Sequence, residues 1–376
     1  MTLLDAVSIR TSQRRYLPTP IDPAQQLQLQ KTIDQCCRRS GLHIQLICNR
    51  PEPFASFVST YGMLSGVRNY IVLAGSKDDP HLEEKCGYYG EEIVLTATSM
   101  GLGTCWVGGT FKKSACACHL TEGEKLVCVI TIGHTAEMTT GRQSMIRKVV
   151  RRKSKTIQEL SSGLEQAPSW FKSGMESVQR APSAVNRQGV LFTASPEGDI
   201  TASRTSNGPF SLVDLGIAKY HFELGAHGGT WTWGDNSCFQ KAQEEKSCGA
   251  VIWRWGNCAH EYLLARHNGG HWSFPKGHVE SDETEIETAL REIREETGLL
   301  AEIDSGFRHL VTYYPKPNVV KDVVFFLATV TGGAEHAQEE EIAEIGWFSF
   351  DEARNNITYA SDEAILLAAE KYLSNH

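Results

Sequence analysis

The chain lacks any hydrophobic run that approaches the roughly 18 consecutive apolar residues of a membrane-spanning helix. This absence argues against a protein that crosses the bilayer as helices. The first residues, MTLLDAVSIRTSQRR, interrupt their only short apolar stretch with Asp5 and contain no small-residue cleavage site. They do not resemble a secretory signal, so we expect a cytoplasmic protein that does not contact a membrane.

The eleven cysteines lack the CxxC pairs and the regular spacing of a disulfide framework. Their odd number and the absence of a signal indicate a reducing compartment. Cys116, Cys118 and His119 form the sequence CACH, which could begin a metal site. No second ligand pair follows at finger-like spacing, so ordinary thiols are the favoured interpretation.

Internal repeats and low-complexity tracts are also missing, and 41% apolar with 22% charged residues is the balance of a globular protein rather than a disordered one. A length of 376 residues suggests a multidomain chain. For the basic segment 142–155, the favoured interpretation is a solvated surface stretch, and the alternative is an anion-binding arm.

Acidic charge is concentrated near the C-terminus. Residues 246–376 hold 11 basic and 22 acidic side chains, whereas the other 245 residues hold 26 and 23. We therefore expect two domains, at residues 1–240 and 245–376. A domain with this acidic excess is a poor non-specific nucleic-acid binder, but it could bind small phosphate compounds through metal ions on its carboxylates.

The segment from Gly277 to Leu299 is the most informative part of the sequence. Asp282 is a suitable N-cap, and Glu285 completes a capping box. Gly298 is placed to end the helix after about Thr297. Spacings of i, i+3, i+4 and i+7 predict one apolar face made of Ile286, Ala289, Leu290 and Ile293.

A second face of this helix carries carboxylates at i, i+3 and i+4, namely Glu292, Glu295 and Glu296. Neighbouring carboxylates repel one another unless a cation or an arginine neutralises them. Hard oxygen ligands suit Mg²⁺ or Mn²⁺, which in turn suit phosphate substrates. The alternative is a solvated acidic helix face.

The same segment resembles the Nudix box at each of its nine specified positions over 23 residues. The resemblance covers about residues 247–373. It implies a Nudix α/β/α sandwich with a mixed sheet, and hydrolysis of a nucleoside diphosphate linked to another group. By position it implies metal ligation by the Gly277 carbonyl and by the three glutamates, and a bracing pair between Arg291 and Glu283.

The flanks of the box resemble the asymmetric diadenosine tetraphosphate hydrolases. The matching stretches are HWSFPKGHVE at 271–280, the Gly-Phe pair at 306–307, KDVVFFLATV from Lys321 and EIAEIGW from Glu341. The resemblance implies cleavage of diadenosine tetraphosphate to ATP and AMP. It gives Glu341 the role of a further metal ligand or general base. It assigns the phosphate chain to Lys276, Tyr313 and Lys321, and adenine stacking to Tyr359. Similar Nudix enzymes act on diphosphoinositol polyphosphates or 8-oxo nucleotides.

Four motifs in the first 240 residues resemble, in order, the flavin-dependent nitroreductases. They are Arg10-x-Ser12-x-Arg14, Gly-Leu-Gly-Thr-x-Trp at 101–106, the stretch from Gly133 to Glu137, and Pro-Ser-Ala-x-Asn-x-Gln at 182–188. The resemblance implies a nitroreductase-like α+β domain that binds FMN and takes hydride from NAD(P)H. It implies cofactor contacts from Arg10, Ser12, Arg14, Gly103, Thr104, Asn186 and Gln188.

The last of these motifs lies much later in the chain than in single-copy nitroreductases. This order resembles the tandem nitroreductases, in which a partial second copy, here from about residue 166, follows the first. Three readings of the whole chain stay open. In the first, the chain is a Nudix pyrophosphohydrolase with a nitroreductase-like domain attached. In the second, it is a bifunctional oxidoreductase and hydrolase. In the third, it is a Nudix hydrolase regulated by a non-catalytic flavin- or nucleotide-sensing domain. A homodimer is compatible with each.

Overall fold

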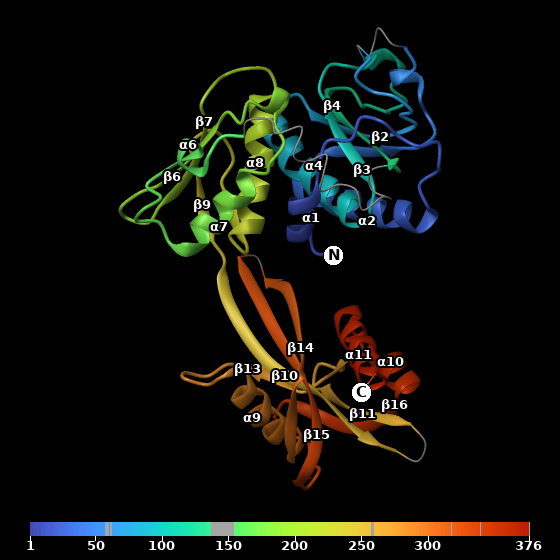
Figure 1. The fold of residues 1–376 in the computed structure, drawn as a ribbon, viewed down its shortest axis with the longest axis vertical. Helices are drawn as coiled ribbons and strands as arrows, with labels where there is room; N and C mark the ends of the chain where they lie inside the picture. Colours follow the sequence, from blue (N-terminus) through green and yellow to red (C-terminus); the bar gives the residue numbers. More distant parts are fainter. Residues whose placement is uncertain are drawn as a thin grey trace. The chain divides into compact units, whose positions relative to one another are not determined.

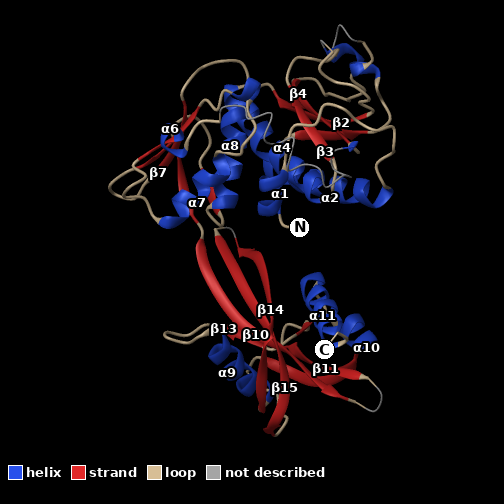
Figure 2. Cartoon of the chain, viewed as in Figure 1, coloured by secondary structure: helices blue, strands red, loops and turns tan. Residues whose placement is uncertain are grey.

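The structure, a computed structural model, describes residues 1–56, 60, 62–136, 154–256, 259–316, 318–338 and 340–375. The chain divides into two compact units, Met1–Lys241 and Ala242–His376. Both units combine helices and strands (Figures 1 and 2), which confirms the expected α+β class. Glu137, Cys258 and nearly all of the basic segment 142–155 lie outside the described residues.

The N-terminal unit is built in two parts. The first contains α1 (Leu3–Ile9), α2 (Pro23–Ser40), β1 (His43–Ile47), η1 (Glu52–Phe54), β2 (Asn69–Ser76), α4 (Leu82–Ser99), β3 (Gly103–Val107), η2 (Lys113–Ala115) and β4 (Glu124–Gly133). The second contains α6 (Ile157–Leu160), β5 (Ser161–Ser162), α7 (Ser169–Val178), η4 (Ala184–Asn186), β6 (Val190–Ala194), β7 (Ile200–Arg204), α8 (Ser211–Gly225), β8 (Gly229–Trp231) and β9 (Ser237–Lys241).

The first part is a four-stranded antiparallel sheet in the order β1-β2-β4-β3. Strand β2 is buried on both faces, so it alternates between two cores. Ile71 and Leu73 pack with residues of α2 and α4, while Tyr70 and Val72 join Phe54 in a separate cluster.

The second part is a five-stranded sheet in the order β5-β6-β7-β9-β8. Its core includes Leu160 of α6, and its first strand, Ser161–Ser162, already pairs with β6. Thus the second sheet begins a few residues before position 166. Helix α8 contributes Ile217 to the core of the first part and Phe222 to that of the second, and so joins the two layers.

Helices α4 and α8 lie side by side in the N-terminal unit (Figure 1) and cross at two glycines. A Cβ atom on Gly87 would collide with the carbonyl oxygen of Val213, and one on Gly216 would collide with the carbonyl oxygen of Glu84. Glycine is unfavourable inside a helix, but at these two positions only a residue without a side chain lets the two backbones approach.

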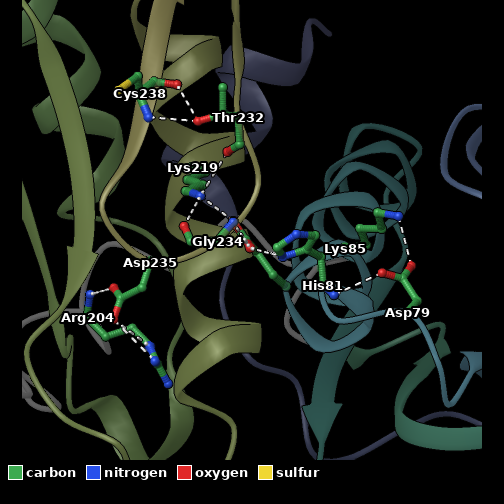
Figure 3. A network of polar contacts seen from close by, with 10 residues as sticks. Asp79, His81, Lys85, Arg204, Lys219, Thr232, Gly234, Asp235 and Cys238 are labelled. Atoms are coloured by element: carbon green, nitrogen blue, oxygen red, sulfur yellow. Dashed lines mark hydrogen bonds and ion pairs between the residues drawn. The ribbon is translucent and has the colours of Figure 1, made fainter.

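A buried ion pair lies at the same crossing. Lys219 of α8 and Glu84 of α4 are both fully buried and bonded to each other. Figure 3 shows the Lys219 ammonium directed at the carbonyls of Thr232, at 3.3 Å, and Gly234, at 3.0 Å. The Gly234 N–H donates to Glu84 at 2.7 Å. Each charged atom therefore has partners, as burial of an ion pair demands.

The C-terminal unit is a seven-stranded mixed sheet with three helices among its described residues. The elements are β10 (Gln243–Trp255), β11 (His260–His267), β12 (Trp272–Ser273), β13 (Lys276–His278), α9 (Glu285–Thr297), β14 (Leu299–Lys316), β15 (Val319–Gly333), β16 (Ile342–Ser349), α10 (Phe350–Asn356) and α11 (Ala360–Leu373). The strand order is β12-β11-β10-β15-β14, with β13 paired to β10 and β16 to β11. Only β10 and β15 pair in parallel among these strands.

Helices cover both faces of this sheet. Successive residues of β10 point to opposite faces, so Val251 packs with α10 and α11 residues while Ile252 packs with Ala289 and Ile293 of α9. The arrangement is the expected α/β/α sandwich. In the described parts of the chain, no helix is both long and apolar enough to cross a membrane.

Candidate functional site

Helix α9 carries the carboxylate cluster, and its N-terminus differs from the expectation. The N-cap is Thr284, whose hydroxyl accepts from Glu287 N–H while Glu287 bonds back to Thr284. The prediction of Asp282 and Glu285 was wrong because Asp282 has φ 72°, a left-handed turn conformation rather than the extended one of an N-cap. The predicted end is confirmed, since Gly298 follows Thr297 with φ 72°.

The apolar face of α9 is narrower than predicted. Ala289 and Ile293 are fully buried against the sheet, and Leu290 is half-buried. Ile286 is 37% exposed, which corrects its assignment to the core. The buried face instead includes Glu292 and Glu296, so this helix turns two carboxylates inward.

Arg291 contacts three of the four box glutamates. Its Nε and Nη2 donate to the two Glu283 oxygens at 2.7 and 3.0 Å, and Nη1 donates to Glu292 at 2.7 Å and Glu295 at 2.9 Å. Nη2 also donates to the His278 carbonyl at 2.8 Å, which ties the helix to β13. Hydrogen bonding to Arg291 lowers the pKa of Glu283 to about 2. The expected Arg291–Glu283 pair is therefore present.

Glu296 is the one box glutamate that Arg291 does not contact. It is 2% exposed, and its Oε2 has no hydrogen-bond partner among the described residues. Burial raises the pKa of Glu296 to about 8; the Lys276 ammonium opposes this rise, and the charges of Glu292 and Glu341 add to it. Burial also raises the pKa of Glu292, and Glu295 and Glu341 contribute to that rise. The exposed Glu341 thus lies close enough to act on both buried carboxylates.

Gly277 lies directly against this cluster. It is in β13, opposite Cys248 of β10, and a Cβ atom there would collide with the Glu292 carboxylate. The missing side chain lets the Gly277 backbone approach the acidic face, where its carbonyl could serve as an oxygen ligand.

The donor chemistry matches a divalent cation, although the arrangement is not a preformed metal site. The part of the chain that the structure describes contains no group of three His, Cys, Asp or Glu side chains arranged to hold a metal, which also removes support for a CACH site. At the glutamates, Arg291 already bonds to Glu292 and Glu295. Among the box glutamates, Glu296 has a buried oxygen without a hydrogen-bond partner in the described structure, and a carboxylate oxygen of this kind suits a divalent cation.

Lys276 connects the carboxylates with a second group of side chains. Its Nζ donates to Ser273 at 3.4 Å, and its charge acts on Glu296, His267, His271, Asp362 and Lys321. Lys321 Nζ lies 3.3 Å from His278 Nε2, and burial, with repulsion from Lys276, lowers the pKa of Lys321. Two cations thus lie near one another beside an acidic cluster.

The two predicted tyrosines also gather here. Tyr313 of β14 is opposite Lys321 of β15 in register. Burial raises the pKa of Tyr313, and the charges of Asp362 and Tyr359 add to this rise. Tyr359, at the N-cap of α11, is 51% exposed, and its ring centroid lies 5.6 Å from that of His271.

Three residues of this group were not predicted as site residues. His267 and His271 stack with centroids 4.4 Å apart, and burial lowers the pKa of His267 to about 4. Asp362 is buried, and burial raises its pKa. His271 lies inside the matched HWSFPKGHVE stretch and could have been chosen from it, whereas no local pattern distinguishes His267 or Asp362.

The N-terminal unit contains a cavity of about 630 Å³ lined by both of its parts. Its lining includes Ser12, Arg14, Leu64, Trp106, Val185, Asn186, Phe210 and Asp214. Among the predicted cofactor residues, Ser12 and Arg14 therefore meet Asn186 at one cavity, although Asn186 is distant from them in sequence. Arg14 is exposed, and no ion pair to it is formed within the described residues.

The other four predicted cofactor residues do not line this cavity. Gln188 accepts from Lys155 N–H at 2.7 Å and donates to the Gln179 carbonyl at 3.0 Å. Arg10 is directed at the buried Glu91, 3.8 Å away. Gly103 and Thr104 begin β3, where the Thr104 carbonyl accepts from Gln13 N–H at 2.8 Å and holds the N-terminal segment. Gln188 and Thr104 thus bond to other parts of the protein, Arg10 lies beside Glu91, and the cofactor contacts expected of these four residues stay predictions.

Two lining residues that sequence reasoning missed are Trp106 and Asp214. Trp106 Nε1 donates to Glu91 at 2.8 Å, and Glu91 bonds to the buried His221 at 2.9 Å. Both Asp214 oxygens accept from Ala184 N–H, at 2.9 and 3.1 Å, and burial raises the Asp214 pKa to about 6. Trp106 was within a quoted motif, but Asp214 has no signal in the sequence.

Comparisons with known proteins match the two parts of the chain to different families. Residues 2–226 match the family model described as "Putative TM nitroreductase", and residues 249–369 match the NUDIX domain model. An asymmetrical bis(5'-nucleosyl)-tetraphosphatase of Mus musculus is 34% identical over 140 residues, covering 34% of this chain and 95% of that protein. An 8-oxo-(d)GTP phosphatase of Mycolicibacterium smegmatis is 33% identical over 131 residues, covering 32% of this chain and 40% of that protein.

A solved structure from Thermotoga maritima, described as a "putative nitroreductase", is 22% identical to this chain. The match covers 64% of this chain and 94% of that protein, with a TM-score of 0.43. The family models and the tetraphosphatase relative agree with the two resemblances found in the sequence. The chain belongs to the TM nitroreductase family over residues 2–226 and is a Nudix hydrolase over residues 249–369.

Proposed function

We propose that the C-terminal unit is a Mg²⁺-dependent hydrolase that cleaves diadenosine tetraphosphate to ATP and AMP. The observation that carries the proposal is Glu296, a buried carboxylate with an unpartnered oxygen beside Glu292, Glu341 and Lys276. A buried polar atom without a hydrogen-bond partner is costly, and such a cost is expected where a site is built for a cation. The similarity to a tetraphosphatase over nearly that protein's whole length supports this choice of substrate.

Glu292, Glu295, Glu296 and the Gly277 carbonyl would hold the metal, and we assign Glu341 to the base role rather than to ligation. When bound, Mg²⁺ neutralises charge that develops on the phosphates. Lys276 and Lys321 bind the phosphate chain by charge, and Tyr313 donates a hydrogen bond to it. Tyr359 stacks on one adenine, which its exposed ring at the end of α11 permits.

The reaction is hydrolysis of a phosphoanhydride. A water oxygen forms a bond to one phosphorus, the bridging P–O bond breaks, and the bridging oxygen leaves with the electron pair as a terminal phosphate oxygen of the other nucleotide. The water proton passes to a base, for which we choose Glu341, the exposed carboxylate whose charge acts on Glu292 and Glu296. Arg291 does not contact substrate; it orients Glu292 and Glu295 and braces α9 against β13.

Product analysis tests this proposal. Purified full-length protein is incubated with diadenosine tetraphosphate and Mg²⁺, and the nucleotides are separated by chromatography. We expect ATP and AMP in equal amounts, and loss of both in Glu296→Gln but not in the matched surface variant Glu302→Gln. Formation of ADP alone rejects the cleavage position, while faster loss of 8-oxo-dGTP than of the tetraphosphate rejects the substrate.

For the N-terminal unit we propose binding of FMN in the 630 Å³ cavity. Ser12 and Arg14 reach this cavity from the N-terminal segment and Asn186 from the loop before β6, and Arg14 supplies a cation for the phosphate. FMN when bound supplies hydride transfer with NAD(P)H. The test is the visible spectrum of full-length protein after incubation with FMN and desalting, with Arg14→Gln as the variant and the neighbouring Arg15→Gln as control.

A flavin band retained by wild type and by Arg15→Gln, and weakened in Arg14→Gln, is the expected result. NADH oxidation by the loaded protein favours a bifunctional enzyme. Flavin retention without NADH oxidation favours a sensing role instead. No retained flavin in wild type removes the cofactor proposal.

A further inference from the structure

The proposed base, Glu341, lies in a turn directly before β16 rather than inside a helix or strand. Its side chain is exposed, so packing of the side chain does not fix where the carboxylate lies. A base must be held within hydrogen-bond reach of the proton that it takes. The contacts of the backbone around Glu341 therefore matter for the reaction.

One side of this segment is fixed to the end of α9. His336 N–H donates to the Thr297 carbonyl at 3.0 Å. Gln338 N–H donates to the Glu296 carbonyl at 3.4 Å, and the Gln338 carbonyl accepts from Glu341 N–H at 3.1 Å. The backbone that leads to Glu341 is thus tied to the helix that carries the carboxylate cluster.

The other side of the segment is fixed by Asn268, in the turn between β11 and β12. Asn268 N–H donates to the Glu341 carbonyl at 2.9 Å. The side-chain Nδ2 of Asn268 donates to the Glu340 carbonyl, also at 2.9 Å. One residue therefore bonds to two successive carbonyls. An amide side chain supplies such a donor without placing a further charge beside the acidic cluster.

The turn that presents Asn268 is held by its own contacts. His267 N–H donates to the His271 carbonyl at 2.9 Å, and Gly270 N–H donates to the His267 carbonyl at 2.7 Å. The two imidazole rings stack with their centroids 4.4 Å apart, and Ser273 Oγ lies 2.8 Å from His267 Nε2. Asn268 thus belongs to a turn closed by both backbone and side-chain contacts, which is what a support for a reacting group requires.

We propose that Asn268 is a positioning residue for the hydrolysis, because its two hydrogen bonds hold the backbone of Glu341 where the carboxylate can take the proton of the attacking water. The inference rests on the hydrolase function and on the base role of Glu341 proposed above. Asn268 acts through Glu341 and not on the substrate. The proposed phosphate-binding residues Lys276 and Tyr313 lie on β13 and β14, so loss of the Asn268 amide should affect turnover rather than binding.

Two variants of Asn268 test this role with diadenosine tetraphosphate at saturating Mg²⁺. Asn268→Ala removes the side-chain donor and should lower kcat about fivefold. Asn268→Asp keeps the shape but turns an oxygen toward the Glu340 carbonyl, and should lower kcat about tenfold. In both variants KM should stay within about twofold of wild type. The Tm of the full-length protein should stay within about 2 °C.

The matched control is Asn375→Asp. The Asn375 amide also donates to a backbone carbonyl of the same unit, that of Lys371 at 2.7 Å. This variant should leave kcat at the wild-type value. Wild-type kcat in Asn268→Asp overturns the positioning role while the hydrolase function stands.

A double-mutant cycle tests whether Asn268 acts through Glu341. Glu341→Gln should itself lower kcat at least about 100-fold, as loss of a general base does. Adding Asn268→Asp to Glu341→Gln should then change kcat less than about twofold, because the group that Asn268 positions is already lost. A tenfold effect of Asn268→Asp in both backgrounds overturns the inference, and so does wild-type kcat in Glu341→Gln. Absence of tetraphosphate hydrolysis by wild type overturns the proposed function together with the inference.

Discussion

Arg291 and Glu283 form a two-pronged ion pair, with Nε–Oε1 at 2.7 Å and Nη2–Oε2 at 3.0 Å. The remaining guanidinium nitrogen, Nη1, bonds to Glu292 and Glu295. One planar group thus fixes the turn before α9 and two of the proposed ligands. Lysine carries the same charge but cannot reproduce this fork.

We therefore expect Arg291→Lys to lower kcat for tetraphosphate hydrolysis by about 10- to 100-fold, as loss of an orienting contact around a metal site commonly does. KM should change less, because Arg291 does not contact the substrate. Steady-state kinetics at saturating Mg²⁺ measure both. Arg308→Lys, which alters a comparable pair with Glu285, is the control. Equal losses in the two variants would refute the orienting role.

Glu296→Gln should remove hydrolysis without destabilising the fold. The carboxyl is buried, its Oε2 lacks a partner, and burial raises its pKa to about 8, so without metal it is mostly neutral near pH 7 and an amide of the same shape replaces it at little cost. Turnover should fall at least about 1,000-fold, as expected when a metal site loses a charged ligand. Tm in EDTA should be equal to or above wild type. A fall of several degrees would show that Glu296 is mainly structural.

Tyr359→Ala should raise KM for diadenosine tetraphosphate about three- to tenfold and leave kcat nearly unchanged, because an exposed stacking contact acts on binding. Tyr359→Phe keeps the ring and should behave as wild type. The comparison uses initial rates over a range of substrate concentrations. A KM for Tyr359→Ala equal to that of wild type would remove adenine stacking from the site.

The buried Lys219–Glu84 pair predicts a large change in stability. Lys219→Met leaves Glu84 buried without its counter-charge, so the free energy of unfolding should fall by about 3–5 kcal/mol. Lys125→Met, which alters an exposed pair with Glu83 in the same unit, should cost less than about 1 kcal/mol. Urea unfolding of the full chain, followed by tryptophan fluorescence, measures both. Adding Glu84→Gln to Lys219→Met should restore part of the loss.

Glu223 predicts a pH dependence in the N-terminal unit. Burial raises the pKa of Glu223 to about 8, although Tyr88 donates a hydrogen bond to it. A carboxyl whose pKa is higher in the folded state favours folding when protonated. Its contribution is thus full below pH 4.5, the ordinary value, and is lost as pH rises toward 8.

Glu223→Gln removes that titration. The unfolding free energy of wild type relative to Glu223→Gln should decline between about pH 5 and pH 8, by up to about 1.4 kcal/mol per pH unit. Using the difference cancels other groups that titrate in this range. A difference that is constant across these pH values would show that Glu223 is not held protonated.

Some features of this structure could be predicted from the sequence, because they depend only on residues that are close together in the chain. The positions of Glu292, Glu295 and Glu296 on one helix face follow from helical geometry, and the end of α9 follows from Gly298. The helix start was predicted two residues too early, since two overlapping capping boxes were available and only the left-handed turn at Asp282 selects Thr284.

The rest was decided by tertiary structure, because it depends on groups distant in sequence that compete for the same side chain. Arg10 and Arg14 look alike in the sequence, but Glu91 lies next to Arg10 while Arg14 is left at the cavity. Asn186 and Gln188 are two residues apart, yet Gln179 and Lys155 take Gln188. The sequence determined which motifs the chain carries, whereas packing determined which of their residues line the cavity, because lining depends on contacts between segments that are distant in sequence.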